Sequence, residues 1–122
     1  MTAVEVLTRA KEILMEKPWG KGAHRNQKGE LCMAGAHLEA YAGRCLKGME
    51  FLDYAMRMGE CNPEQFSYLN RAATRLFPER GERTASVNDH PETTFQDVMA
   101  VFDDAILLAK EAEAAAHVKE TA

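Results

Sequence analysis

Apolar residues recur at steps of three and four along most of this chain, and this periodicity constrains its fold more than any other feature. The longest such stripe lies in the last third of the sequence and consists of Phe95, Val98, Phe102, Ala105, Ala109 and Ala112. This spacing places side chains on one face of an α-helix. Val101, Ile106 and Leu108 widen the face to about half of the circumference. We therefore expect a central helix over about residues 94–117 that contacts several neighbours.

Four further helices are predicted from the same periodicity and from residues that start and end helices. They cover about residues 3–16, 31–42, 46–58 and 62–76. Thr2 is a suitable N-cap for the first helix, because its hydroxyl can accept a backbone N–H bond. Asn62 followed by Pro63 is a strong start for the fourth. Gly43 and Gly59 are expected to end the second and third. The pattern predicts a mainly α-helical bundle of about five helices.

Length and hydropathy favour one domain. The 122 residues are enough to bury roughly two-thirds of the unfolded surface. No linker or internal repeat divides the chain, so residues 1–122 are expected to form a single helical domain with a tail that frays from about residue 117. No apolar stretch approaches the ~20 residues that cross a bilayer, so we expect no membrane partner.

Charge and cysteine content argue against several classes of function. The formal net charge is −4, whereas proteins that bind nucleic acid normally have a basic face, so we expect no nucleic-acid partner. Cys32, Cys45 and Cys61 form no C-x-x-C pair, and no nucleotide-binding motif occurs, so we expect no metal and no cofactor. The odd cysteine count and the lack of an apolar signal segment predict buried, reduced thiols in the cytoplasm.

Two polar segments interrupt the helices, and the first is a glycine-rich loop or short hairpin near residues 19–31. Its candidate ligand-binding side chains are Trp19, Lys21, His24 and Arg25. The single tryptophan could form the wall of a pocket, anchor an interface or cover one end of the core. We favour the third role, because aromatic side chains are most often buried against a core. The basic residues are either an anion site beside glycine N–H groups or a solvated surface. We favour the surface, because no phosphate-loop motif is present.

The second polar segment precedes the last helix. Residues 84–87 are expected to be extended and residues 88–91 to form a turn. Asn88 and Asp89 either offer an amide and a carboxylate to a ligand, or shape this turn and hold the start of the last helix. We favour the structural role.

Two more candidates lie on predicted helices. His37 is either a general base or ligand, or a half-buried histidine with a hydrogen-bond partner, which we favour. Cys32 and His37 fall on different helix faces, so a shared metal would need other ligands. Leu107 lies on the polar side of the last helix. Together with Ala100 and Ala114 it would form a contact surface for another protein or for a second copy.

Four motifs, in a fixed order, carry a family resemblance. They are W-G-K-G (19–22), G-E-L-C-M-A-G-A (29–36), S-V-N-D (86–89) and T-x-x-D-V-x-x-x-F-D-x-A-I (94–106). The set resembles a family of small uncharacterised proteins from actinobacteria and their bacteriophages, over about residues 5–110. Residues 45–83 carry no matching motif. The resemblance implies a cytoplasmic helical protein whose Trp19 loop and Asn88-Asp89 turn belong to one constellation. It implies no activity.

These observations lead to two functional hypotheses. The first is a non-enzymatic accessory protein that binds a host protein in the bacterial cytoplasm, as a monomer or a homodimer. The alternative is a small-molecule or nucleotide-binding module, or a weak enzyme, with a cleft between the Trp19 loop and the Asn88-Asp89 turn. The alternative requires five side chains to converge on a polar cavity. They are Trp19, Lys21, His37, Asn88 and Asp89.

Overall fold

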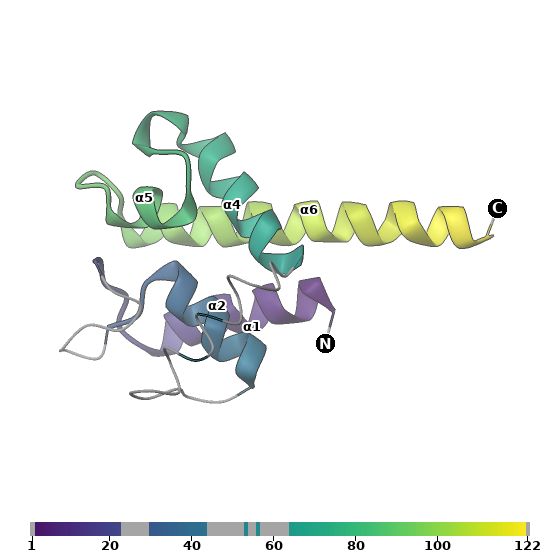
Figure 1. Ribbon diagram of the computed structural model, residues 1–122, viewed down its shortest axis with the longest axis horizontal. Helices are drawn as coiled ribbons and strands as arrows, with labels where there is room; N and C mark the ends of the chain where they lie inside the picture. Colours follow the sequence, from purple (N-terminus) through teal and green to yellow (C-terminus); the bar gives the residue numbers. More distant parts are fainter. Residues whose placement is uncertain (1, 23–29, 44–52, 54–55, 57–63, 122) are drawn as a thin grey trace.

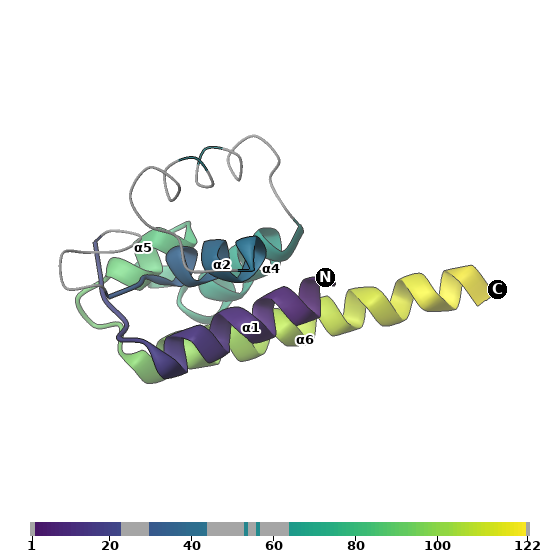
Figure 2. The ribbon, with the colours of Figure 1, turned by 90° about the horizontal axis from the view of Figure 1, so that it is seen from below.

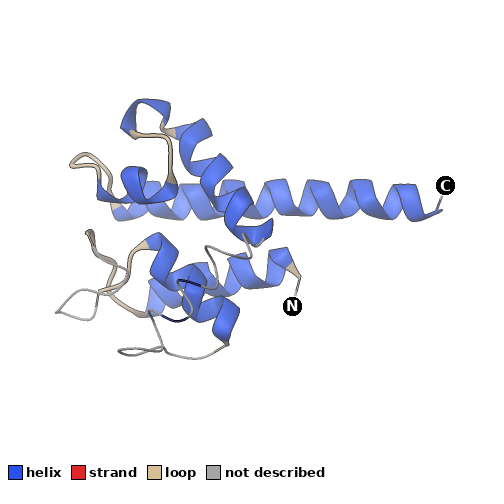
Figure 3. Ribbon diagram, in the orientation of Figure 1, coloured by secondary structure: helices blue, strands red, loops and turns tan. Residues whose placement is uncertain are grey.

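Helix α6 is the longest element, and both α1 and α4 pack along it (Figure 1). A computed structural model of the chain describes residues 2–22, 30–43, 53, 56 and 64–121. In chain order the elements are α1 (Ala3–Glu16), α2 (Met33–Ala42), α4 (Glu64–Leu76), the 3-10 helix η1 (Pro78–Arg80), α5 (Thr84–Asp89) and α6 (Phe95–Thr121). Figure 3 shows helices and loops but no strand in this part of the chain. The predicted mainly α-helical bundle is confirmed.

The helices enclose one apolar core. Helix α2 packs on α1, and the short α5 contacts both α2 and α4. Helices α1 and α6 run in opposite directions and lie side by side in both views (Figures 1 and 2). The ammonium of Lys11 on α1 forms an ion pair with the carboxylate of Asp103 on α6 at 2.6 Å. The largest fully buried apolar side chains are Phe102, Leu7, Leu14, Leu31, Met33, Leu38, Leu69, Val87, Val98 and Val101.

No helix in the described ranges is long and apolar enough to cross a bilayer.

Helix α1 has the predicted bounds and the predicted cap. The Thr2 hydroxyl accepts a bond from the Glu5 backbone N–H at 3.2 Å, and the Glu5 carboxylate accepts one from the Thr2 N–H at 3.3 Å. This reciprocal capping box satisfies two backbone donors that a helix start leaves unpaired. The periodicity of the sequence places Val6, Leu7, Ala10, Ile13 and Leu14 on one face of this helix, and the structure buries all of them.

Helix α2 begins at Met33, two residues later than expected, because Leu31 pairs with another segment and Cys32 serves as N-cap. Its end at Gly43 is confirmed, where the backbone has a positive φ of 76°. The predicted helix over 46–58 and the predicted signals at Gly59, Asn62 and Pro63 lie outside the described residues, except that Asp53 and Met56 are helical. The described part of α4 agrees with the prediction.

The glycine-rich loop is closed at its base by backbone hydrogen bonds. The Gly20 N–H donates to the Leu31 carbonyl and the Leu31 N–H donates to the Pro18 carbonyl, each at 3.0 Å. The resulting bridge between Trp19 and Leu31 is parallel, whereas a β-hairpin pairs its strands antiparallel. The middle of this loop, residues 23–29, lies outside the described residues.

The prediction for residues 84–91 is wrong. Residues 84–89 form helix α5, and the turn follows it, with the Thr93 N–H donating to the His90 carbonyl at 3.0 Å. Two contacts from other elements explain the helix. The Asn70 side-chain oxygen accepts bonds from the Thr84 N–H at 2.7 Å and the Thr84 hydroxyl at 3.1 Å. Thr84 and Val87, three residues apart, are both buried. Tertiary packing here overrides the extended preference of β-branched residues.

Helix α6 starts with a second capping box. The Thr94 hydroxyl accepts from the Asp97 N–H at 3.2 Å, and the Asp97 carboxylate accepts from the Thr94 N–H at 3.0 Å. The Arg80 guanidinium also donates to Asp97 at 2.8 Å, and this hydrogen bond lowers the pKa of Asp97. The sequence allows either Thr93 or Thr94 as the cap of this helix, and the structure shows that Thr94 is the cap. The helix continues to Thr121, past residue 117, where the sequence predicts fraying.

We expect Gly81→Ala to lower the free energy of unfolding by about 2 kcal/mol, from backbone strain and a steric clash. Gly81 has a φ of 142°, and an added Cβ would overlap the Cβ of Ser86. Gly43→Ala is the matched control, because φ is also positive there but no atom lies within 4 Å of the added Cβ. Urea denaturation measures the free energy of unfolding of both variants. Equal losses of stability would contradict the steric part of this explanation.

Candidate functional site

The Trp19 segment and the end of α5 meet in space, as the resemblance implies. The Trp19 indole N–H donates to the side-chain oxygen of Asn88 at 2.8 Å, across 69 residues of sequence. The Gly22 N–H donates to the Asp89 carboxylate at 2.8 Å. We call this set the Asn88 cluster, and its members are Trp19, Gly20, Lys21, Gly22, Asn88 and Asp89.

Asn88 is the centre of this cluster. Its side chain is 1% exposed. Its oxygen accepts from Trp19 and also from the Met33 backbone N–H at 3.0 Å. Its amide nitrogen donates to the Gly20 carbonyl at 3.2 Å and to the Asp89 carboxylate at 2.9 Å. Each hydrogen-bonding position of the Asn88 amide is therefore occupied by protein.

Lys21 closes the outer side of the cluster. Its ammonium donates to the His90 carbonyl at 2.7 Å and lies 5.6 Å from the centre of the Trp19 ring. The Trp19 ring is half-buried against the core, with Phe95 at a centroid distance of 6.4 Å. Trp19 thus covers one end of the core, which is the role that the sequence favours.

The polar groups of the cluster are largely bonded to one another. A ligand at this place would have to displace hydrogen bonds that already satisfy buried donors and acceptors. Trp19, Lys21, Asn88 and Asp89 are brought together, whereas His24 and Arg25 lie outside the described residues. The hydrogen bonds of the cluster therefore hold the loop after α1 against the end of α5.

His37 is not part of the cluster, and its environment differs from the expected one. It is fully buried on α2, where its ring packs against Phe66 at 5.5 Å. Neither ring nitrogen has a hydrogen-bond partner within the described part of the chain. The prediction of a half-buried, hydrogen-bonded histidine is therefore wrong. Burial lowers the pKa of His37 to about 4, because the charged form is poorly solvated there.

Cys32 is buried, as predicted. Its sulfur accepts a bond from the Gly35 N–H at 3.3 Å, which caps α2, and burial raises the pKa of the thiol. A raised pKa disfavours the reactive thiolate. Cys45 and Cys61 lie outside the described residues. Within the ranges that are described, no three His, Cys, Asp or Glu side chains are grouped as metal ligands would be.

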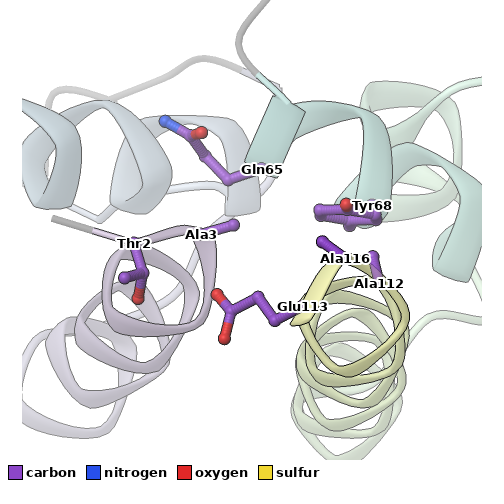
Figure 4. Close-up of a pocket in the computed structure, with 7 residues that line it drawn as sticks. All are labelled: Thr2, Ala3, Gln65, Tyr68, Ala112, Glu113 and Ala116. Carbon is purple, nitrogen blue, oxygen red and sulfur yellow. The ribbon is translucent and has the colours of Figure 1, made fainter. Parts of the chain in front are cut away.

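At least two pockets that are lined by described residues lie at other places on the bundle. The first, of about 350 Å³, lies between the starts of α1 and α4 and the second half of α6 (Figure 4). We call it the Ala116 pocket; it is lined by Thr2, Ala3, Gln65, Tyr68, Ala112, Glu113 and Ala116. The second, of about 440 Å³, lies between α2, α4 and α5. We call it the Phe66 pocket; it is lined by Ala34, Phe66, Ser67, Asn70, Arg83, Thr84 and Ala85.

Sequence reasoning missed both pockets and the anchoring role of Asn70. Residues that line each pocket come from three separate elements, so no local motif marks them. Leu107 is 50% exposed on α6, and Ala100 and Ala114 are exposed as well. The contact role of Leu107 stays a prediction.

Comparison with known proteins gives a family but no activity. No curated protein and no solved structure matches the chain. A family model described as "Family of unknown function (DUF6197)" matches residues 1–108, which include the Asn88 cluster. The chain therefore belongs to DUF6197, a family of unknown function.

Proposed function

We propose that this chain is a non-enzymatic accessory protein that binds another protein through the projecting end of α6. The observation that carries this proposal is the exposure of α6 beyond the bundle. Residues 113–117 are all exposed, although the same helix is buried at Ala105 and Ala109 (Figures 1 and 2). Alanine, glutamate and lysine favour helix without tertiary contacts, so this end can present a regular surface to a partner.

The Ala116 pocket would give such a partner an anchor point. Ala3, Ala112 and Ala116 are small, so a neighbouring helix can approach closely. In Figure 4 the Tyr68 ring lies beside Ala112 and Ala116, and the Glu113 carboxylate extends towards the start of α1. An apolar side chain from an amphipathic helix would fill this space, because such helices bind in grooves through anchors at helical spacing. A basic residue next to that anchor would pair with Glu113.

The cellular setting proposed here is the bacterial cytoplasm. The order of motifs resembles proteins from actinobacteria and their phages, which supports a host protein as the partner. Self-association through Leu107 is a separate proposal. Leu107 lies about half a turn away from Ala116 around the helix, at 100° per residue, so the two faces can be tested independently.

The alternative function is a small-molecule or nucleotide-binding module, or a weak enzyme, at the Asn88 cluster. Contact between Trp19 and Asn88 supports it. The hydrogen bonds that occupy the Asn88 amide count against it, because a polar ligand needs unsatisfied partners. Neither pocket described above includes a member of this cluster.

We expect Ala116→Glu to weaken partner binding by about tenfold, or ~1.4 kcal/mol, because it places a charge in the pocket. Immobilised chain would be incubated with an actinobacterial lysate, and captured proteins would be identified by mass spectrometry. Ala115→Glu is the matched control, because Ala115 is exposed next to Ala116 but does not line the Ala116 pocket. Circular dichroism checks that both variants fold.

The proposal requires one protein that is captured by wild type and Ala115→Glu but lost with Ala116→Glu. Equal capture by all three chains, or capture by none, would count against the α6 surface. Sedimentation of wild type and Leu107→Glu tests self-association. An unchanged mass would count against the homodimer.

A further inference from the structure

We infer that the Phe66 pocket binds a small organic carboxylate, with the carboxylate held by Arg83 and Asn70 and the apolar part held against Phe66. This inference goes beyond the proposed protein-binding function and uses a different surface. The pocket volume of about 440 Å³ lies in the range of small-molecule sites. Ligand pockets of this kind combine apolar walls with a few polar groups that fix orientation.

The orientation of the Asn70 amide is fixed. Its oxygen accepts two bonds from Thr84, at 2.7 Å from the backbone N–H and 3.1 Å from the hydroxyl. The amide nitrogen must then point the other way, and it has no hydrogen-bond partner within the described ranges. Asn70 lines the pocket. It therefore supplies a preorganised donor to any acceptor bound there.

Two other polar side chains of the pocket, Arg83 and Ser67, are also available as donors. Arg83 is exposed at the start of α5, and it pairs with no carboxylate in the part of the chain that is described. Ser67 likewise keeps its hydroxyl free of any protein bond there. None of the described lining residues is acidic. A guanidinium beside an amide and a hydroxyl favours a planar anion with two acceptor oxygens.

The remaining wall is apolar and small. Phe66 provides an aromatic face, and Ala34 and Ala85 leave space in front of it. The Phe66 ring also packs against the fully buried His37 at 5.5 Å, so this wall borders the core. A ligand with a ring or short alkyl group next to its carboxylate would bury that group here. One guanidinium matches the single charge of a carboxylate better than the higher charge of a phosphate.

The test uses phenylacetate as the probe in an NMR titration of the full chain. Saturable shifts of the Asn70 side-chain amide and of the Ala34 and Ala85 methyl groups are expected. Phenylacetamide, a neutral analogue of the same shape, should bind at least about tenfold more weakly. Inorganic phosphate should not compete. Equal binding of the amide, or displacement by phosphate, would overturn the proposed ligand class.

Two variants locate the site and one controls for charge. Arg83→Gln should weaken phenylacetate binding about tenfold, and Ala85→Trp should abolish it by filling the pocket. Arg71→Gln should leave binding within about twofold, because Arg71, the residue after Asn70, is also exposed but does not line the pocket. Shifts that map to another surface, or unchanged binding by both pocket variants, would overturn the assignment.

Discussion

Replacing Asn88 with alanine is expected to lower the free energy of unfolding by about 4 kcal/mol. The substitution removes four hydrogen bonds at a position that is 1% exposed. It leaves three protein groups without partners, namely the Trp19 indole N–H, the Met33 N–H and the Gly20 carbonyl. An unsatisfied buried polar group costs about 1–3 kcal/mol, which sets the size of the effect.

Urea denaturation followed by tryptophan fluorescence measures this loss directly, because Trp19 is the only tryptophan and is bonded to Asn88. Asp89→Asn is the matched control. Asp89 is exposed, and asparagine retains an oxygen that can accept the Gly22 bond, so we expect a loss below about 1 kcal/mol. If Asn88→Ala keeps wild-type stability, the cluster does not fasten the fold, and the alternative ligand-binding role gains support.

Acidification from pH 7 to pH 4 is expected to lower the free energy of unfolding by about 3 kcal/mol through His37 alone. The pKa of His37 is about 4 in the folded chain, against an ordinary value of 6.5. Between these values the unfolded state binds a proton that the folded state excludes. Stability therefore falls as the pH decreases from about 6.5 to about 4, and it is fully present above pH 7.

His37→Leu is the variant that tests this explanation. Leucine fills a similar volume without polar atoms, so it should remove the acid dependence and raise stability at pH 5. The pKa of Asp97 is also lowered, through its hydrogen bond to Arg80. The stability that this carboxylate contributes to the fold is lost only as the pH falls below 3.8, the ordinary pKa of aspartate. Urea denaturation at pH 4.5, 5.5 and 7 separates the two groups. An equal acid dependence in wild type and His37→Leu would contradict the assignment to His37.

The sequence predicted those elements whose stabilising contacts are local. The Thr2 and Thr94 caps bond to backbone groups three residues away, and the apolar face of α1 repeats within each turn. Such interactions can be seen in a short window of sequence, because helix geometry alone brings those residues together. The bounds of α1 and the start of α6 followed from them.

Helix α5 and the environment of His37 could not be predicted in the same way. Thr84 and Val87 favour extended structure locally, and they become helical because Asn70 binds the helix start and the core covers Val87. His37 is fully buried on a helix whose residues are mostly apolar, packs against Phe66, and has no hydrogen-bond partner among the residues that the structure describes. Neither outcome depends on residues next to these positions in the sequence.

The sequence by itself determined a helical bundle, the Thr2 cap of α1 and two polar segments of unusual composition. Only the tertiary structure decided that Asn88 bonds to residues 55–69 positions away and that α6 continues beyond its neighbours. It also decided that residues from α2, α4 and the start of α5 line one pocket, the Phe66 pocket. The reason is that helix periodicity fixes which face of a segment is apolar. The packing of several faces at once determines which polar groups meet and which remain free to bind.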